Sequence, residues 1–198
     1  VELGNDITLN EPGSTTKKGW TPEGTSENPF KGYFDGKGHS INGLYLSKAT
    51  VSEMGYGKVA TAGLFGYAES ATISNTNLAD VDIDIKLKTE DYDGVNALYT
   101  GCQIGYLKNG NITSCNVSGT ISIDIESAGD GYSSLSGCYG GIVGELRDGK
   151  SITDCQFDGS ISISAPGSQS SIDNGVGGIG GTIHADGIKN LTNNGIIE

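Results

Sequence analysis

The chain has 198 residues, of which 33 are glycine, and its 24 acidic and 12 basic residues give a net charge of −12. Glycine makes up about one residue in six, against an ordinary usage of roughly 7%, which predicts a chain that turns often and suits a single domain of this length. The negative charge makes nucleic acid and anionic lipid poor partners, and no apolar run approaches the roughly 18 residues of a membrane span.

Residues 1–50 are predicted to form the N-terminal coils of a repeat fold. Within PFKGYFDGKGHSINGLYL, residues 35–38 (DGKG) are expected to make a tight reversal. Four apolar residues of this stretch are predicted to supply core: Phe30, Phe34, Ile41 and Leu44. Since Val1 already stands in such a pattern, we expect a leader and further domains of a longer protein before it.

Three later segments align with one another, and a fourth is a degenerate copy: residues 63–85, 102–125, 141–164 and 178–197. Matched glycines are separated by 39, 39 and 37 residues: Gly66, Gly105, Gly144 and Gly181. Matched isoleucines are separated by 39, 40 and 36 residues: Ile73, Ile112, Ile152 and Ile188. A constant period with small slips predicts one repeated structural unit, with variation of length confined to loops.

Each copy carries a stretch in which apolar residues alternate with small polar ones, such as VDIDI at 81–85 and ISIDI at 121–125. Alternation with a period of two is typical of a strand with one buried face. No segment shows the 3.6-residue pattern of a helix, which excludes βαβ and leucine-rich horseshoe folds. The sequence therefore predicts an all-β, right-handed parallel β-helix of about 39-residue repeats, forming one domain over residues 1–198.

Polar segments rich in glycine, serine and aspartate separate the copies: KLKTEDYDGVNALYT, ESAGDGYSSLSGC and APGSQSSIDNGV. We expect them to protrude as loops from one side of the solenoid. Tyrosines in or beside the loops are the predicted ligand-binding residues: Tyr56, Tyr92, Tyr99, Tyr132 and Tyr139. Exposed tyrosines suit recognition of sugars or proteins through rigid aromatic contact and hydrogen bonds. The alternative is that these rings cover the ends of the core.

The order of ELGNDITLN, then GWTPEGTSENPFKGYFDGKGHSINGLYLS at 19–47, then the first GLFGY copy resembles the bacterial β-helical repeat proteins with the Gly-Leu-rich "GLUG" motif. The resemblance covers residues 3–197 and implies a secreted or surface-displayed protein. Some members of that family are adhesin-like, and some are attached to IgA-cleaving metallopeptidases. It implies no catalytic chemistry, because these repeats are identified by structural residues. The HExxH motif of a metallopeptidase is absent, and His39 and His184 are the two histidines.

Cys115 and Cys155 occupy the same repeat position, so they are expected one above the other on adjacent coils. In-register side chains point the same way, which leaves their Cβ atoms wider apart than the roughly 3.8 Å that a disulfide prefers. This favours a stack of reduced, small core residues over a disulfide. The pairing of Cys102 and Cys138 stays open, and the four cysteines show neither a CxxC pair nor a zinc spacing.

An acidic row lies on one predicted strand and continues on the next: Asp80, Asp82 and Asp84, then Asp124 and Glu126. Calcium prefers oxygen ligands. Carboxylates that alternate along a strand, however, lie roughly 7 Å apart, too far for one ion without loop oxygens. The row is therefore interpreted as a solvated face, and no metal or other cofactor is predicted.

The leading hypothesis is a non-catalytic extracellular or cell-surface scaffold and adhesion module, whose loops bind a glycan or a host or extracellular protein. A carbohydrate-active β-helix enzyme, a lyase or glycosidase, is the first alternative. It would need two carboxylates about 5–9 Å apart or a charge-neutralising cation. No carboxylate pair has an apolar or aromatic sequence context, and Arg147 is the one arginine, so no enzyme is predicted. The second alternative is a pure stalk whose open ends associate end to end.

Overall fold

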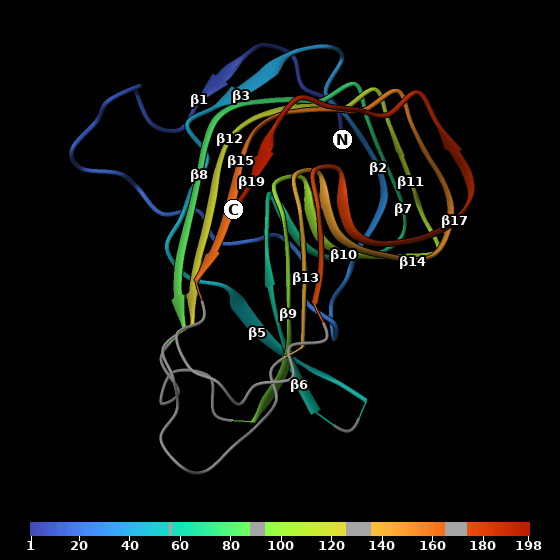
Figure 1. Ribbon diagram of the computed structural model, residues 1–198. Coiled ribbons are helices and arrows are strands. Elements are labelled where there is room, and N and C mark those ends of the chain that lie inside the picture. The colour runs from blue at the N-terminus through green and yellow to red at the C-terminus, as the bar shows by residue number, and fades with distance from the viewer. Residues whose placement is uncertain (56, 88–93, 126–135, 165–173) are drawn as a thin grey trace.

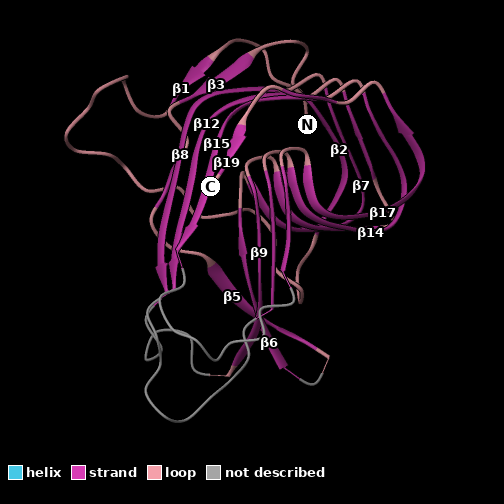
Figure 2. Ribbon diagram, in the orientation of Figure 1, coloured by secondary structure: helices cyan, strands magenta, loops and turns pink. Residues whose placement is uncertain are grey.

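The computed structural model describes residues 1–55, 57–87, 94–125, 136–164 and 174–198, which form strands and no helix (Figure 1, Figure 2). Apart from one antiparallel hairpin, the strands pair in parallel with their counterparts in neighbouring coils; Ile112, for example, pairs with both Ile73 and Ile152. The predicted parallel β-helix is confirmed. The described part contains no helix long and apolar enough to span a membrane.

Three sheets run along the solenoid. Sheet C contains β5 (Thr50–Met54), β6 (Gly57–Ala62), β9 (Val95–Gly101), β13 (Ser136–Gly140) and β16 (Asn174–Gly177). Sheet A contains β2 (Phe30–Asp35), β7 (Phe65–Ser74), β10 (Ile104–Lys108), β11 (Asn111–Thr113), β14 (Val143–Thr153) and β17 (Gly180–Lys189). Sheet B contains β1 (Ile7–Thr8), β3 (Ser40–Asn42), β4 (Tyr45–Leu46), β8 (Asn77–Leu87), β12 (Asn116–Ile125), β15 (Gln156–Ser164), β18 (Thr192–Asn193) and β19 (Ile196–Ile197).

Each full coil passes through sheet C, then sheet A, then sheet B. The successive coils are β6–β7–β8, β9–β10–β11–β12, β13–β14–β15 and β16–β17–β18–β19. Before them, β2, β3 and β4 supply sheets A and B, and β1 pairs with β3 at the N-terminal end. The antiparallel hairpin of β5 and β6 joins these first strands to the regular coils.

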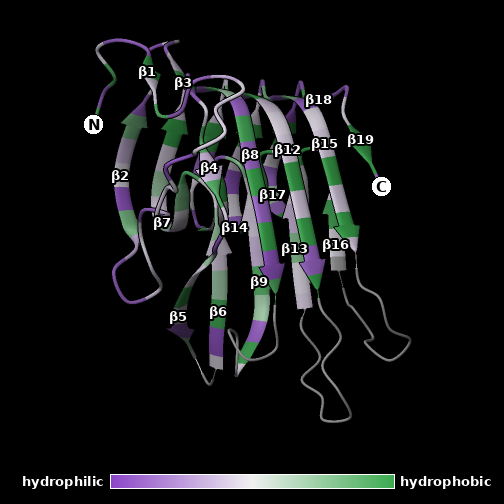
Figure 3. Ribbon diagram, turned by 90° about the vertical axis from the view of Figure 1, so that its left-hand side faces the viewer, coloured by the Kyte–Doolittle hydropathy of each residue, from purple (hydrophilic) through white to green (hydrophobic). Residues whose placement is uncertain are grey.

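The core lies inside the coils and follows the predicted alternation. On sheet B the residues between the isoleucines of the alternating stretches face outward. The isoleucines themselves are buried: Ile83, Ile85, Ile121, Ile123 and Ile161. Figure 3 shows the result as apolar bands that cross β8, β12 and β15 at matching heights. Phe34, Ile41 and Leu44 are buried as expected, and Phe30 packs against this core while partly exposed.

The corner between sheets A and B uses a column of residues with left-handed backbone. Their φ angles lie between 50° and 55°: Asn75, Ser114, Asp154 and Asn190. Short polar side chains tolerate this conformation better than other residues with a Cβ atom. The turn places the next residue of each coil toward the interior, which is why Cys115 and Cys155 are buried.

At the matched glycines, sheets C and A approach each other so closely that the backbone leaves no space for a side chain. A Cβ atom on Gly144 would lie 2.7 Å from the Thr100 nitrogen and 2.9 Å from the Cys138 oxygen. A Cβ atom on Gly105 would lie 2.8 Å from the Tyr99 oxygen. Gly105 and Gly144 are therefore required by this contact, and Gly144 also by its neighbour in sheet A, since the Gly105 oxygen would lie 2.4 Å from the added Cβ atom.

We expect Gly144→Ala to lower the free energy of unfolding by about 3 kcal/mol, since the new methyl group collides with backbone that is fixed by two neighbouring coils. Urea denaturation monitored by circular dichroism measures this. The matched control is Gly187→Ala in β17, where the nearest atoms to a Cβ stand at 3.4 Å. Equal stability of the two variants would show that the close contact does not constrain the fold.

Candidate binding site

Two columns of side chains meet on the outer side of the turn between sheets C and A. Register pairs Tyr106 of sheet A with Tyr67 in the preceding coil and with Glu145 in the following coil. On sheet C, Tyr99 pairs with Thr61 and Cys138. We call Tyr67, Tyr99, Tyr106, Glu145 and Arg147 the tyrosine cluster.

The three tyrosine rings pack on one another. The ring centroids of Tyr67 and Tyr106 lie 4.8 Å apart in a stacked arrangement, and Tyr99 meets Tyr106 edge-on at 5.0 Å. Tyr67 and Tyr106 are 7% and 2% exposed, whereas Tyr99 is partly exposed. Such aromatic pairs stabilise a fold by about 0.5–1.5 kcal/mol each beyond their buried area. Because the ring faces cover one another, the polar groups of the cluster are what remains for a partner.

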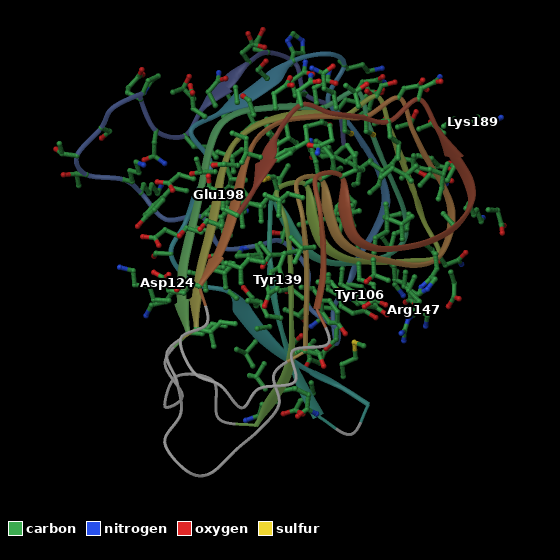
Figure 4. The ribbon with its side chains drawn as sticks, viewed as in Figure 1. Tyr106, Asp124, Tyr139, Arg147, Lys189 and Glu198 are labelled. Carbon is green, nitrogen blue, oxygen red and sulfur yellow. The ribbon has the colours of Figure 1, made fainter. Side chains whose placement is uncertain are left out.

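Glu145 and Arg147 form an ion pair at the edge of these rings. The Arg147 Nε donates to the Glu145 Oε1 at 2.9 Å, and the side chain of Glu145 is 6% exposed whereas that of Arg147 is 51% exposed. The negative charge of Glu145 raises the pKa of Arg147. In Figure 4, Tyr106 and Arg147 lie on the same outer side of β10 and β14. The buried carboxylate thus holds a guanidinium that solvent and partners can reach.

The tyrosines of the cluster are neutral phenols at physiological pH. Burial, with a smaller contribution from Glu145, raises the pKa of Tyr99 to about 12. The same two causes raise the pKa of Tyr106, and burial also raises the pKa of Tyr67. The partly exposed Tyr99 and Arg147 can therefore offer one phenol and one guanidinium to hydroxyl, amide or carboxylate groups of a partner.

The five tyrosines that were predicted to bind a ligand do not share one location. Tyr99 belongs to the cluster. The prediction that Tyr139 is an exposed binding residue is wrong, because Tyr139 lies in β13 and is 0% exposed. Its hydroxyl has no hydrogen-bond partner. Its strand begins at Ser136, and alternation turns Tyr139 inward beside Thr100, its register partner. Tyr56, Tyr92 and Tyr132 lie outside the described residues.

The sequence interpretation missed Tyr67, Tyr106 and Glu145. Their signal was present, because the three residues stand 39 positions apart and occupy the same place in GLFGY, CQIGY and GIVGE. Glu145 went unnoticed as a buried carboxylate because its aromatic neighbours belong to adjacent strands and to the preceding coil. A search for carboxylate pairs within one segment cannot detect it.

All four cysteines are free thiols. Cys115 and Cys155 are buried one coil apart, in accord with their interpretation as small core residues. The hydrogen bond with Cys155, together with burial, raises the pKa of Cys115. Cys102 is buried, whereas Cys138 is partly exposed beside the tyrosine cluster with its Sγ 3.2 Å from the Thr182 Oγ1.

The acidic row lies on the outer face of sheet B. Asp82 and Asp84 alternate with buried residues along β8, and Asp82 forms an ion pair with Lys17. Asp124 is on β12, and Glu126 lies outside the described residues. Within the described ranges, no group of three or more His, Cys, Asp and Glu side chains is placed to hold a metal ion.

Comparisons with protein families, with curated proteins and with solved structures find no match for the chain. The resemblance to GLUG-motif proteins therefore stays a prediction. What the tyrosine cluster can do follows from its own geometry and chemistry.

We expect Arg147→Ala to lower the free energy of unfolding by about 1–3 kcal/mol, because it leaves the Glu145 carboxylate buried without its partner. Adding Glu145→Gln should restore part of the loss. The control is Lys108→Ala one coil away, whose partner Glu69 keeps Lys31 at 3.2 Å. This exposed pair should contribute less than about 1 kcal/mol. Thermal melts in which both single variants lose equal stability would contradict the assignment.

Alkaline pH should destabilise the fold partly through Tyr99. The folded chain holds the pKa of Tyr99 near 12, whereas the unfolded chain releases the proton near the ordinary pKa of about 10. The stability that the neutral phenol contributes is complete below pH 10 and is lost as pH rises from about 10 to about 12. Urea denaturation across this window should show a smaller loss in Tyr99→Phe than in the unsubstituted chain. Tyr33→Phe, which changes a 75% exposed tyrosine, should leave the pH profile unaltered.

Proposed function

We propose that this chain is a non-catalytic scaffold and adhesion module of an extracellular or cell-surface protein, and that it binds a glycan or a partner protein. The strands of neighbouring coils pair in parallel; β12, for instance, pairs with β8 on one side and with β15 on the other. Such a ladder makes each coil a support for the next and gives a rigid body that holds surface groups at constant spacing.

The observation that carries the proposal is the common edge at which the strands of sheet B end and the strands of sheet C begin. β8, β12 and β15 run side by side and finish at the same edge, where β9, β13 and β16 begin (Figure 1). Residues 88–94, 126–135 and 165–173 connect them and differ in length and sequence. Variation confined to one edge of a regular scaffold is typical of binding surfaces.

The tyrosine cluster adds chemistry that suits a partner. Tyr99 lies on β9, which begins at the loop edge, and Arg147 is half exposed. Tyrosine and arginine are enriched in the central residues of protein interfaces because they combine large contact area with directed hydrogen bonds. The proposal therefore includes the cluster as a second contact.

The same residues give less support to the alternative that the chain is a glycosidase or a polysaccharide lyase. Glu145 is the one acidic side chain in the buried core of the described part, and Arg147 neutralises it. A glycosidase needs a second carboxylate as nucleophile or base, with the acid kept protonated by its surroundings. The ion pair with Arg147 instead supports a structural role for Glu145.

The test is a binding array of glycans and extracellular-matrix proteins probed with the whole chain. We expect a reproducible hit that weakens at least tenfold in the double variant Tyr92→Ala/Tyr132→Ala. Tyr33→Ala on β2, remote from the loop edge in sequence and exposed, is the matched control and should bind normally. Silence across the array, with the fold verified by circular dichroism, would reject adhesion and leave the stalk hypothesis.

A further inference from the structure

A pocket of about 120 Å³ opens on the outer face of sheet B, near the N-terminal end of the solenoid. The segment 10–17 forms one wall, and β4 and β8 form the other. The polar and aromatic residues that matter for its chemistry are Asn10, Lys17, Tyr45, Asp80 and Asp82. The tyrosine cluster does not contribute to it.

The wall formed by segment 10–17 is held in place by one amide. The Asn10 Nδ2 donates to the Gly43 carbonyl at 2.8 Å and to the Lys18 carbonyl at 3.1 Å, and the Lys18 nitrogen donates to the Asn10 Oδ1 at 2.7 Å. Gly43 has a φ of 71°, and a Cβ atom there would collide with the Asn10 backbone. Asn10 thus holds the two ends of the loop together and fixes them to the turn between β3 and β4, so the pocket is preformed.

Three different chemical groups converge inside the pocket. Tyr45 and Asp82 are register partners on adjacent strands, so their side chains leave the sheet side by side. Lys17 reaches both of them: it forms an ion pair with Asp82, and its Nζ lies over the Tyr45 ring, 5.3 Å from the ring centre. Asp80 adds an exposed second carboxylate two residues before Asp82.

The charges and the polarity select among ligand classes. Glu11, Asp80 and Asp82 outweigh Lys17, which opposes an anionic ligand. A purely apolar ligand would remove water from the ion pair without replacing its hydrogen bonds. An uncharged hydroxyl group can replace the hydrogen bonds of both partners of the ion pair, because it donates to the Asp82 carboxylate and accepts from the Lys17 ammonium.

We propose that this pocket binds one pyranose residue of an uncharged glycan. Two neighbouring hydroxyls would bridge Asp82 and Lys17, and the apolar face of the sugar ring would pack against Tyr45. The small volume limits the pocket to a single ring, which suits the end of a glycan chain. This inference rests on the proposed adhesion function and names its ligand class and one subsite.

The experiment is ligand-observed NMR of the whole chain with methyl glycosides of uncharged hexoses and N-acetylhexosamines. At least one glycoside should show saturable binding, and Asp82→Asn and Tyr45→Ala should each weaken it at least tenfold. Asp84→Asn is the matched control, because it removes the same charge from the same face of β8 two residues beyond the pocket. Lys17→Met, which removes the donor from an exposed loop, keeps the test valid if Tyr45→Ala fails to fold.

Three outcomes would overturn the proposal that the pocket binds a sugar: no saturable binding of any glycoside, binding that survives all pocket variants, or salt-sensitive binding of methylammonium in place of the sugars. The last outcome would make the pocket a receptor for a cationic group that displaces Lys17. An array hit that survives Asp82→Asn but is lost in Tyr92→Ala/Tyr132→Ala would preserve the adhesion function and reject this subsite. The two proposals can therefore fail separately.

Discussion

The close contact between the backbones of sheets C and A is the constraint on which the rest of this structure depends. Gly105 and Gly144 allow two strands of one coil to lie back to back without side chains between them. The chain can then reverse within a few residues, enclose the core on one side and leave an outer corner on the other. Tyr99 and Tyr106 meet in that corner because this contact brings their strands together.

Because the coils stack in register, a backbone conformation that one coil adopts at a corner recurs in the other coils along the axis. The left-handed backbone conformation at the corner between sheets A and B occurs in four coils, at Asn75, Ser114, Asp154 and Asn190. Neighbouring polar side chains then bond across coils, as when the Asn190 Nδ2 donates to the Asp154 Oδ1 at 2.8 Å. The same register places the Cys115 and Cys155 thiols together in the core. Energetic terms of this fold are therefore shared between coils, and a substitution in one coil is felt in the next.

The proposed recognition sites lie on different parts of the outer surface of the solenoid. The loop edge lies between sheets B and C, the tyrosine cluster belongs to sheets C and A, and the Tyr45 pocket belongs to sheet B and the N-terminal segment. The cluster offers the Arg147 guanidinium and the Tyr99 phenol, and the pocket offers a paired ammonium and carboxylate beside an aromatic ring. A rigid solenoid with separate contacts can bind an extended or multivalent partner with more avidity than either contact alone.

The sequence by itself determined the parallel β-helix, the buried positions of strands such as 81–85 and 121–125, and the shared interior position of Cys115 and Cys155. All of these follow from a period of 39 residues combined with an alternation of two, which are local and repeated signals. Only the tertiary structure decided that Tyr139 points inward and that Lys17 reaches Asp82. Those outcomes depend on where a strand begins after a variable loop and on contacts between segments with no shared repeat position. Neither the period nor the alternation carries that information.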